Sequence, residues 1–337
     1  MDSPNDFEVL RMLNAFARFE GISLDHVNYE QFFENLREAL AQHKQCATLM
    51  HGLRIQSMFL YVVAALGGCS IITEEDRGEF YALASNIKRP DFRLLLNNGR
   101  EFFVEVKNFY PKNPEMPYRF KEAYLSKLRR YADRFQRDLK IAIYWPQWKN
   151  MWTMVPVDKF LLQGIHRCIS FPEAMVANEM SLLGDCMIAT TPPLGLRFYT
   201  DPDYPRTVEA DGSVTCKFKR VPLYCGEQEI EDSFEKSLAW FFINYGNWVE
   251  DEAPAVIEEG QFISFEIPFI PEERDNPDQP FEGIGFLSQM ISRQYNELTA
   301  PGGHIDFLSP ERQPDQLGIL IPHDYKGKAL PLWRFRF

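Results

Sequence analysis

The chain has 337 residues, of which 45% are hydrophobic and 14% aromatic, so it can bury one large core or two ordinary ones. It contains no run of 18 apolar residues, and its N-terminus lacks the basic and then apolar pattern of a signal peptide, so we expect a cytoplasmic protein without a membrane segment. Its six cysteines form no Cys-x-x-Cys pair and have no histidine at zinc-finger spacing, which favours reduced core thiols over a zinc site.

The formal net charge of −12 argues against a nucleic-acid partner until the distribution of the charges is considered. Residues 88–150 hold 15 Lys and Arg against 7 Asp and Glu, whereas the rest of the chain holds 21 against 41. A locally basic segment in an acidic protein is what a phosphate-binding groove requires. A solvated helix face that pairs with acidic neighbours would give the same pattern, so charge alone leaves both interpretations open.

The first 67 residues carry apolar side chains at helical spacing. Between 7 and 19 a large apolar residue recurs at every third position, and a second such run begins at Tyr29 after Asn28, a typical capping residue. We expect residues 1–50 to form a helical cap that packs over the domain that follows.

Three strand patterns follow an apolar helix expected at 51–66. The first is a short strand at 69–73. Two further apolar-rich runs, 92–96 and 101–106, flank Asn97-Asn98-Gly99, which is a strong local signal for a β-hairpin.

The length of the hairpin loop decides where the charged residues of the hairpin point. A two-residue loop would direct the carboxylates of Asp91 and Glu105 to opposite faces of the sheet. A three-residue loop, with Gly99 in the left-handed conformation, would pair Asp91 with Glu105 on one face, which Lys107 would share. We favour the three-residue loop because it gives the two acids a joint use.

Two carboxylates and an ammonium group at one end of a hairpin suggest a chemical role. The carboxylates repel each other unless a cation lies between them, and a small set of oxygen ligands suits Mg²⁺ or Mn²⁺. The lysine can then orient or help to deprotonate a metal-bound water, or stabilise negative charge on a phosphate under attack. This is the chemistry of phosphodiester hydrolysis.

Pro90-Asp91 followed by Glu105-Val106-Lys107 resembles the signature of the PD-(D/E)XK nucleases, the restriction-endonuclease-like superfamily. The resemblance covers about residues 51–160. It implies that Asp91 and Glu105 are metal ligands, that the Val106 carbonyl is a third ligand, and that Lys107 is the catalytic lysine. Pro-Asp also occurs at three other places in the chain, so the dipeptide alone decides nothing.

The context of the motif adds weight to this resemblance, because it implies a core of helix, three strands, helix and strand. The second helix is expected at 118–139 and the last strand at 140–145. Family members often carry a glutamate on the first helix, where this chain has Gln56. Glu74 and Glu75, just past the first strand, could supply a further acid, although acids at the end of a strand are more often solvated loop residues.

Family members also often place a polar residue and a tyrosine four positions apart on the second helix. Lys127 and Tyr131 have this spacing. The alternative is that Tyr131 packs in the core and Lys127 is solvated. The residues expected to bind nucleic acid are basic side chains in and around this segment: Arg89, Arg93, Lys121, Arg130 and Arg134.

Residues 161–337 have a different composition and hold most of the surplus acid. Helices are expected at 230–245 and 286–298, and strands at 194–199, 214–224, 262–270, 317–322 and 330–337, which predicts an α+β domain. A domain with so much negative charge is poorly suited to recognise nucleic acid by itself. We therefore expect it to mediate a homodimer or to contact a basic partner subunit.

The sequence therefore predicts an α+β protein with three parts: a helical cap (1–50), an α/β restriction-endonuclease-like core with a mixed sheet flanked by helices (51–160), and an acidic C-terminal domain (161–337). The expected activity is a Mg²⁺-dependent endonuclease, with DNA favoured as substrate. The alternative is a catalytically silent nuclease fold that serves as a nucleic-acid-binding or assembly scaffold, and Gln56 in place of an acid is the feature that favours it. A third hypothesis is an unrelated interaction protein with an accidental motif.

Overall fold

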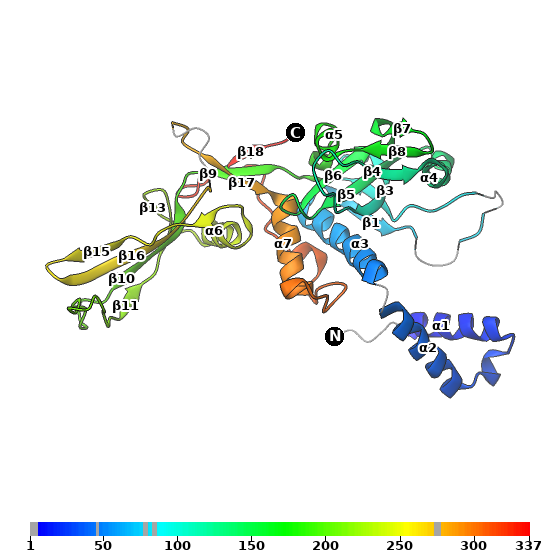
Figure 1. Ribbon diagram of the computed structural model, residues 1–337, viewed down its shortest axis with the longest axis horizontal. Helices are drawn as coiled ribbons and strands as arrows, with labels where there is room; N and C mark the ends of the chain where they lie inside the picture. Colours follow the sequence, from blue (N-terminus) through cyan, green and yellow to red (C-terminus); the bar gives the residue numbers. More distant parts are fainter. Residues whose placement is uncertain (1–5, 45–46, 77–79, 83–85, 273–277) are drawn as a thin grey trace.

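The computed structural model describes residues 6–44, 47–76, 80–82, 86–272 and 278–337. A five-stranded mixed sheet in the order β1-β2-β3-β5-β6 forms the centre of the part that carries the motif (Figure 1). Its strands are β1 (Cys69–Glu74), β2 (Phe92–Leu96), β3 (Glu101–Asn108), β5 (Asp138–Trp145) and β6 (Met151–Pro156). β3 and β5 run parallel and are connected through α4 (Glu122–Arg134), whereas the other neighbours are antiparallel.

Helices cover both faces of this sheet because its strands alternate apolar side chains between the faces. Phe102, Val104 and Val106 of β3 pack with α3 (Ala47–Leu66) in one hydrophobic cluster, and Phe103 packs with α4 in another. The predicted fold class, an α+β chain with a mixed sheet flanked by helices, is confirmed, as is the order of helix, three strands, helix and strand.

Helix α3 is long and apolar enough by composition to cross a membrane between Leu49 and Leu66, where its mean hydropathy is 1.4. Half of that window is buried inside the protein. Its buried side chains, such as Phe59 and Val62, pack against the central sheet, which is the usual place of an apolar core helix.

The hairpin of β2 and β3 has the register that the three-residue loop predicts. Phe92 lies opposite Val104 and Leu95 opposite Glu101, so that the same register, continued by one residue, places Asp91 opposite Glu105. Gly99 has a φ of 82° and donates its N–H to the Leu96 carbonyl at 2.9 Å. A left-handed glycine at this position closes the loop in the expected way.

The helix expected at 118–139 is shorter than its apolar pattern suggested. Tyr118–Lys121 forms strand β4, which pairs with β8 (His166–Ile169), and β8 also pairs with β7 (Leu161–Gln163). Helix α4 ends at Arg134 because Gln136 takes a left-handed φ of 54° and the chain turns into β5. The aromatic side chains in β4 fit a strand as well as a helix, which is why periodicity misplaced the start of the helix.

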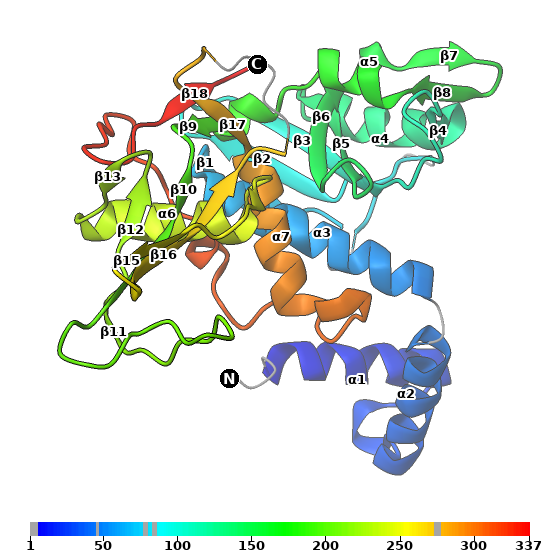
Figure 2. The same ribbon diagram turned by 60° about the vertical axis from the view of Figure 1, so that its left-hand side comes forward.

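The two N-terminal helices, α1 (Asp6–Glu20) and α2 (Tyr29–Lys44), form where the sequence predicted helices. The expectation that they cover the core is wrong. Their buried contacts, among Ala17, Val27 and Phe32, are with each other, and the pair lies to one side of the central sheet beyond the start of α3 (Figures 1 and 2).

The C-terminal part contains helices α5 (Phe171–Val176), α6 (Ser233–Tyr245) and α7 (Leu287–Thr299). A seven-stranded sheet extends away from the core (Figure 1) and contains β10 (Leu194–Thr200), β11 (Phe218–Arg220), β12 (Leu223–Cys225), β13 (Gln228–Glu229), β14 (Val249–Glu250), β15 (Ala255–Glu258) and β16 (Gln261–Ile270). A three-stranded sheet contains β9 (Met187–Thr190), β17 (Glu282–Phe286) and β18 (Trp333–Phe335). Short 3₁₀ helices lie at Leu24–His26, Val157–Lys159, Met180–Leu183, Pro301–Gly303 and Pro314–Gln316.

Both helices expected in this part are present, but two strand expectations need correction. The run at 214–224 is divided into β11 and β12, with Pro222 at the break. Residues 317–322 form no strand, although Leu317 is buried, because Gly318 turns the chain with a φ of 65°. Leu317, Ile319 and Ile321 contact the core from an irregular segment, whereas Leu320 is exposed.

Helix α7 joins the C-terminal part to the central sheet by packing along α3 (Figures 1 and 2). The buried guanidinium of Arg54 in α3 donates to Asn296 Oδ1 at 2.5 Å and to Thr299 Oγ1 at 3.0 Å. Trp152 of β6 donates its indole N–H to Ser292 at 2.8 Å. Residues beyond 161 therefore share one hydrophobic cluster with α3 and the sheet.

Candidate active site

Asp91 is fixed at the start of β2 by hydrogen bonds to both neighbouring strands. Its backbone carbonyl accepts the N–H of Glu75, just after β1, at 2.9 Å. Its Oδ2 accepts the backbone N–H of Val106 in β3 at 2.6 Å. The acid is buried, so its position is set by the sheet rather than by solvent.

Gln56 of α3 completes the surroundings of Asp91 by donating its side-chain N–H to Oδ1 at 2.8 Å. Burial, and next the charge of Glu105, raise the pKa of Asp91 to about 7, while Lys107 opposes the shift. Gln56 therefore acts as a hydrogen-bond donor to the acid and adds no negative charge beside it.

Glu105 is fully buried on β3, and its two oxygens have different surroundings. Oε1 accepts from Lys107 Nζ and from the Tyr124 hydroxyl, each at 2.6 Å. Oε2 is buried and has no hydrogen-bond partner among the described residues. A buried carboxylate oxygen of this kind is available to accept a hydrogen bond from water or to bind a cation.

Tyr124, near the start of α4, is a site residue that the sequence analysis missed. Burial, and next the charge of Glu105, raise the pKa of its hydroxyl, so the hydroxyl keeps its proton and remains the donor. The Lys107 ammonium lies 5.7 Å from the Tyr124 ring centre and 5.9 Å from that of Phe120. The available signal was the close spacing of the aromatic residues Tyr118, Phe120 and Tyr124 after the motif, in a segment expected to be entirely helical.

The paired acids fit a small divalent cation. Asp91 and Glu105 supply two carboxylates to such a site. Within the described ranges, no larger group of three or more His, Cys, Asp or Glu side chains could hold a metal. The Val106 carbonyl points to the same side of its strand as the N–H that binds Asp91, so it faces that acid too. Mg²⁺ keeps several waters and commonly takes one or two protein carboxylates, so the free Oε2 of Glu105 beside this set suits it.

A cleft of about 510 Å³ opens beside the acids. Its first wall consists of His51, Gly52, Ile55 and Gln56 of α3. The opposite wall is formed by 106–108 at the end of β3 and by Tyr110. Lys107 also lines the cleft, and its side chain is 23% exposed while its ammonium binds the buried Glu105 carboxylate.

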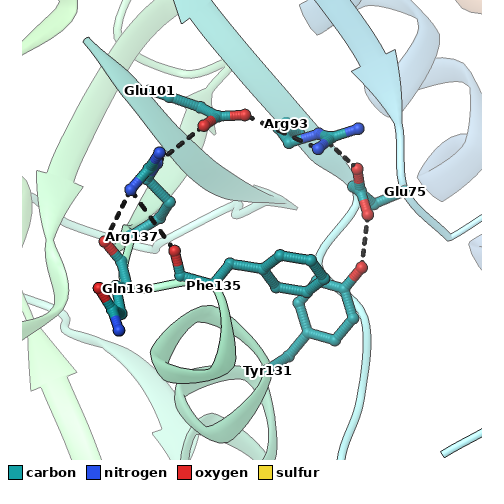
Figure 3. Close-up of polar contacts among 7 residues, drawn as sticks. All are labelled: Glu75, Arg93, Glu101, Tyr131, Phe135, Gln136 and Arg137. Atoms are coloured by element: carbon teal, nitrogen blue, oxygen red, sulfur yellow. Dashed lines mark hydrogen bonds and ion pairs between the residues drawn. The ribbon is translucent and has the colours of Figure 1, made fainter.

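Arg93 and Tyr131 belong to a separate polar network on the α4 side of the sheet (Figure 3). Glu75 accepts from the Tyr131 hydroxyl at 2.5 Å and pairs with Arg93 at 2.8 Å. Arg93 also lies 3.7 Å from Glu101, which pairs with Arg137 at 2.7 Å. This network ties β1, β2, β3 and α4 together, and it places Tyr131 in the core and the Glu75 carboxylate away from Asp91.

The remaining predicted residues take several positions. Glu74 ends β1 opposite Phe92. Arg89 donates to the Asp76 carbonyl at 3.0 Å and lies over the Phe80 ring. The other basic residues named from the sequence, and Lys127, are exposed on α4 or at its start: Lys121, Lys127, Arg130 and Arg134.

No protein-family model matches this sequence, and no curated protein does. Among solved structures, Hjc, a Holliday junction resolvase from the archaeal hyperthermophile Archaeoglobus fulgidus, is similar to part of the chain. The similarity covers 36% of this chain and 93% of the resolvase, with 18% sequence identity and a TM-score of 0.28. Similarity at this level carries no information about the chemistry of this chain, which depends on the side chains described above.

Proposed function

We propose that the chain is a Mg²⁺-dependent endonuclease of the PD-(D/E)XK type that hydrolyses phosphodiester bonds, with DNA as the favoured substrate. The observation that carries the proposal is the buried, unpaired Oε2 of Glu105 beside Asp91, with Lys107 bound to the other oxygen. An ordinary surface hairpin has no reason to bury two acids next to a partly exposed lysine.

Each side chain of the site has a role in this proposal. Asp91, Glu105 and the Val106 carbonyl would hold the cation, and Gln56 and Tyr124 fix the two carboxylates. A bound Mg²⁺ would act as a Lewis acid and make a water more acidic. Lys107 reaches the cleft, where its ammonium can hold a phosphate oxygen and stabilise the negative charge that develops on it.

The purified protein is expected to cut nucleic acid in the presence of Mg²⁺ and to leave it intact in EDTA. Plasmid, linear single-stranded DNA and RNA would be incubated with both buffers and resolved on gels, which also tests the preference for DNA. Absence of cutting on every substrate in Mg²⁺ or Mn²⁺ would argue for the silent scaffold, whose supporting feature is Gln56 in place of an acid. Salt-sensitive binding without cutting would then distinguish that scaffold from a protein with no nucleic-acid role.

We also propose that the C-terminal sheet docks a basic protein partner. Phe198, Phe218, Phe262 and Phe265 form a ring cluster with neighbouring centroids 4.4–6.2 Å apart, and none of the four is buried. Every residue from 249 to 260 is exposed, and five of them are acidic. A second copy would bring like charges together, so a stable homodimer in sedimentation that dissociates on Phe198→Asp would contradict the basic partner.

The three-part division at residues 50 and 160 remains our proposal for how the chain is organised, with the chemistry in 51–160. We also propose a cytoplasmic location for the protein. It is supported by the five cysteines within the described ranges, all of them free thiols, as is usual for proteins of a reducing compartment.

A further inference from the structure

Packing against the other described residues does not explain two features of the cleft walls. The first is Tyr110, which follows β3 and lines the cleft with a side chain that is 64% exposed. Its neighbour Phe109 turns inward, with its ring 5.2 Å from Tyr118 and 5.7 Å from Trp145. Because Phe109 points into the core and Tyr110 points outward, the large aromatic ring of Tyr110 lies in the cleft wall, where it adds little to the core.

The second feature is Gly52, in the interior of α3 on the opposite wall. Glycine destabilises a helix interior relative to alanine, so its presence needs a reason. A Cβ built at Gly52 would have no atom within 4 Å, so packing inside this chain does not require glycine. Gly52 lies one turn before Gln56, which binds Asp91, so the absent side chain leaves open space beside the acids.

The chemistry of the walls defines the ligand that the space suits. The residues that line the cleft carry the ammonium of Lys107, the amides of Gln56 and Asn108 and the ring of Tyr110, and none carries a carboxylate. This combination suits a ligand with a negative charge, hydrogen-bonding edges and a flat aromatic surface. The volume of about 510 Å³ lies within the range of roughly 300–1,000 Å³ that is usual for small-ligand pockets.

We propose that the cleft holds one unpaired nucleotide of the substrate strand, with its base stacked on Tyr110 and its backbone close to Gly52. The inference rests on the proposed nuclease function and names the substrate class: DNA or RNA that is single-stranded or locally unpaired at the site of cutting. In an intact duplex each base is stacked between its neighbours, so a protein ring can reach its face only after the base leaves the helix.

The test is binding of a short fluorescent single strand, as DNA and as RNA, and of the corresponding DNA duplex, measured by anisotropy with Ca²⁺ in place of Mg²⁺. The wild type is expected to bind the single strand more tightly than the duplex. Tyr110→Ala is expected to weaken single-strand binding about tenfold, while Tyr110→Phe, which keeps the ring, retains it. Tyr29→Ala removes an equally exposed tyrosine from α2 and serves as the matched control.

Gly52→Leu provides an independent arm, because leucine favours a helix and has open space at this position. It is expected to keep or raise the melting temperature and to lower single-strand affinity by filling the cleft. Equal single-strand affinities of the wild type, Tyr110→Ala and Gly52→Leu would overturn the inference, as would tighter binding of the duplex or no binding at all. If the variants show these losses of binding but the wild type cuts nothing in Mg²⁺, the cleft assignment stands and the proposed catalysis is contradicted. The comparison of the DNA and RNA single strands shows which sugar is preferred.

Discussion

Lys107→Met is expected to reduce the cleavage rate on the order of 1,000-fold, because it removes the cation at the cleft and keeps most of the side chain's apolar stem. The Lys107 ammonium lies 5.9 Å from the centre of the Phe120 ring and 5.7 Å from that of Tyr124, so methionine keeps an apolar side chain beside both rings. Initial rates on a labelled strand in saturating Mg²⁺ would measure the loss. Circular dichroism and melting temperature would establish that the variant is folded.

Lys236→Ala is the control for this substitution, since Lys236 is an exposed lysine on α6. Its rate is expected to equal that of the wild type. If Lys107→Met retained more than about one tenth of the wild-type rate, the lysine would not be the group that stabilises the developing charge. If the loss of any positive charge were the cause, Lys236→Ala would also lower the rate.

Glu235→Ala is expected to lower the free energy of unfolding by roughly 3–4 kcal/mol, because it removes the buried carboxylate that accepts three backbone N–H groups, of which that of Leu330 is itself buried. The carboxylate of this buried residue in α6 accepts the N–H groups of Lys328, Ala329 and Leu330 at 2.6, 3.0 and 3.2 Å. Leu330 is fully buried in the main hydrophobic cluster, so this carboxylate fixes the returning C-terminal segment against the core. Urea denaturation followed by circular dichroism would measure the change.

Glu229→Ala is the matched comparison, because Glu229 pairs with Arg220 at 2.8 Å on the surface with 41% of its side chain exposed. Loss of such an exposed pair is expected to cost less than about 1 kcal/mol. Similar losses for the two variants would mean that the three N–H groups find water or other acceptors and that Glu235 does not anchor the segment.

Local signals were sufficient to predict the centre of the fold. The Asn97-Asn98-Gly99 turn predicted the hairpin, and the three-residue loop, favoured because it gives Asp91 and Glu105 a joint use, agrees with the observed register. The apolar runs of α3 and β5 were also clear, because β5 is buried along most of its length and half of α3 between Leu49 and Leu66 is buried.

Contacts between distant elements were not predictable from one sequence. Tyr124 meets Glu105 only because α4 crosses over β3, and periodicity gives no distance between a helix and a strand. Arg93 has the charge and spacing of a phosphate ligand, yet Glu75 and Glu101 lie close enough to engage it. Apolar residues of the run at 317–322 pack against the core without forming a strand. The sequence pattern alone cannot distinguish such packing from pairing in a sheet.

Calorimetric titration of Mn²⁺ into the protein, without nucleic acid, tests most directly whether Asp91 and Glu105 form a cation site. Glu105→Gln keeps the shape of the side chain but removes its charge, and it is expected to weaken binding on the order of 100-fold. Glu101→Gln, on the same strand and in the network of Figure 3, is expected to bind Mn²⁺ like the wild type. Equal affinities of the wild type and Glu105→Gln would contradict the assignment of the paired acids as the metal site.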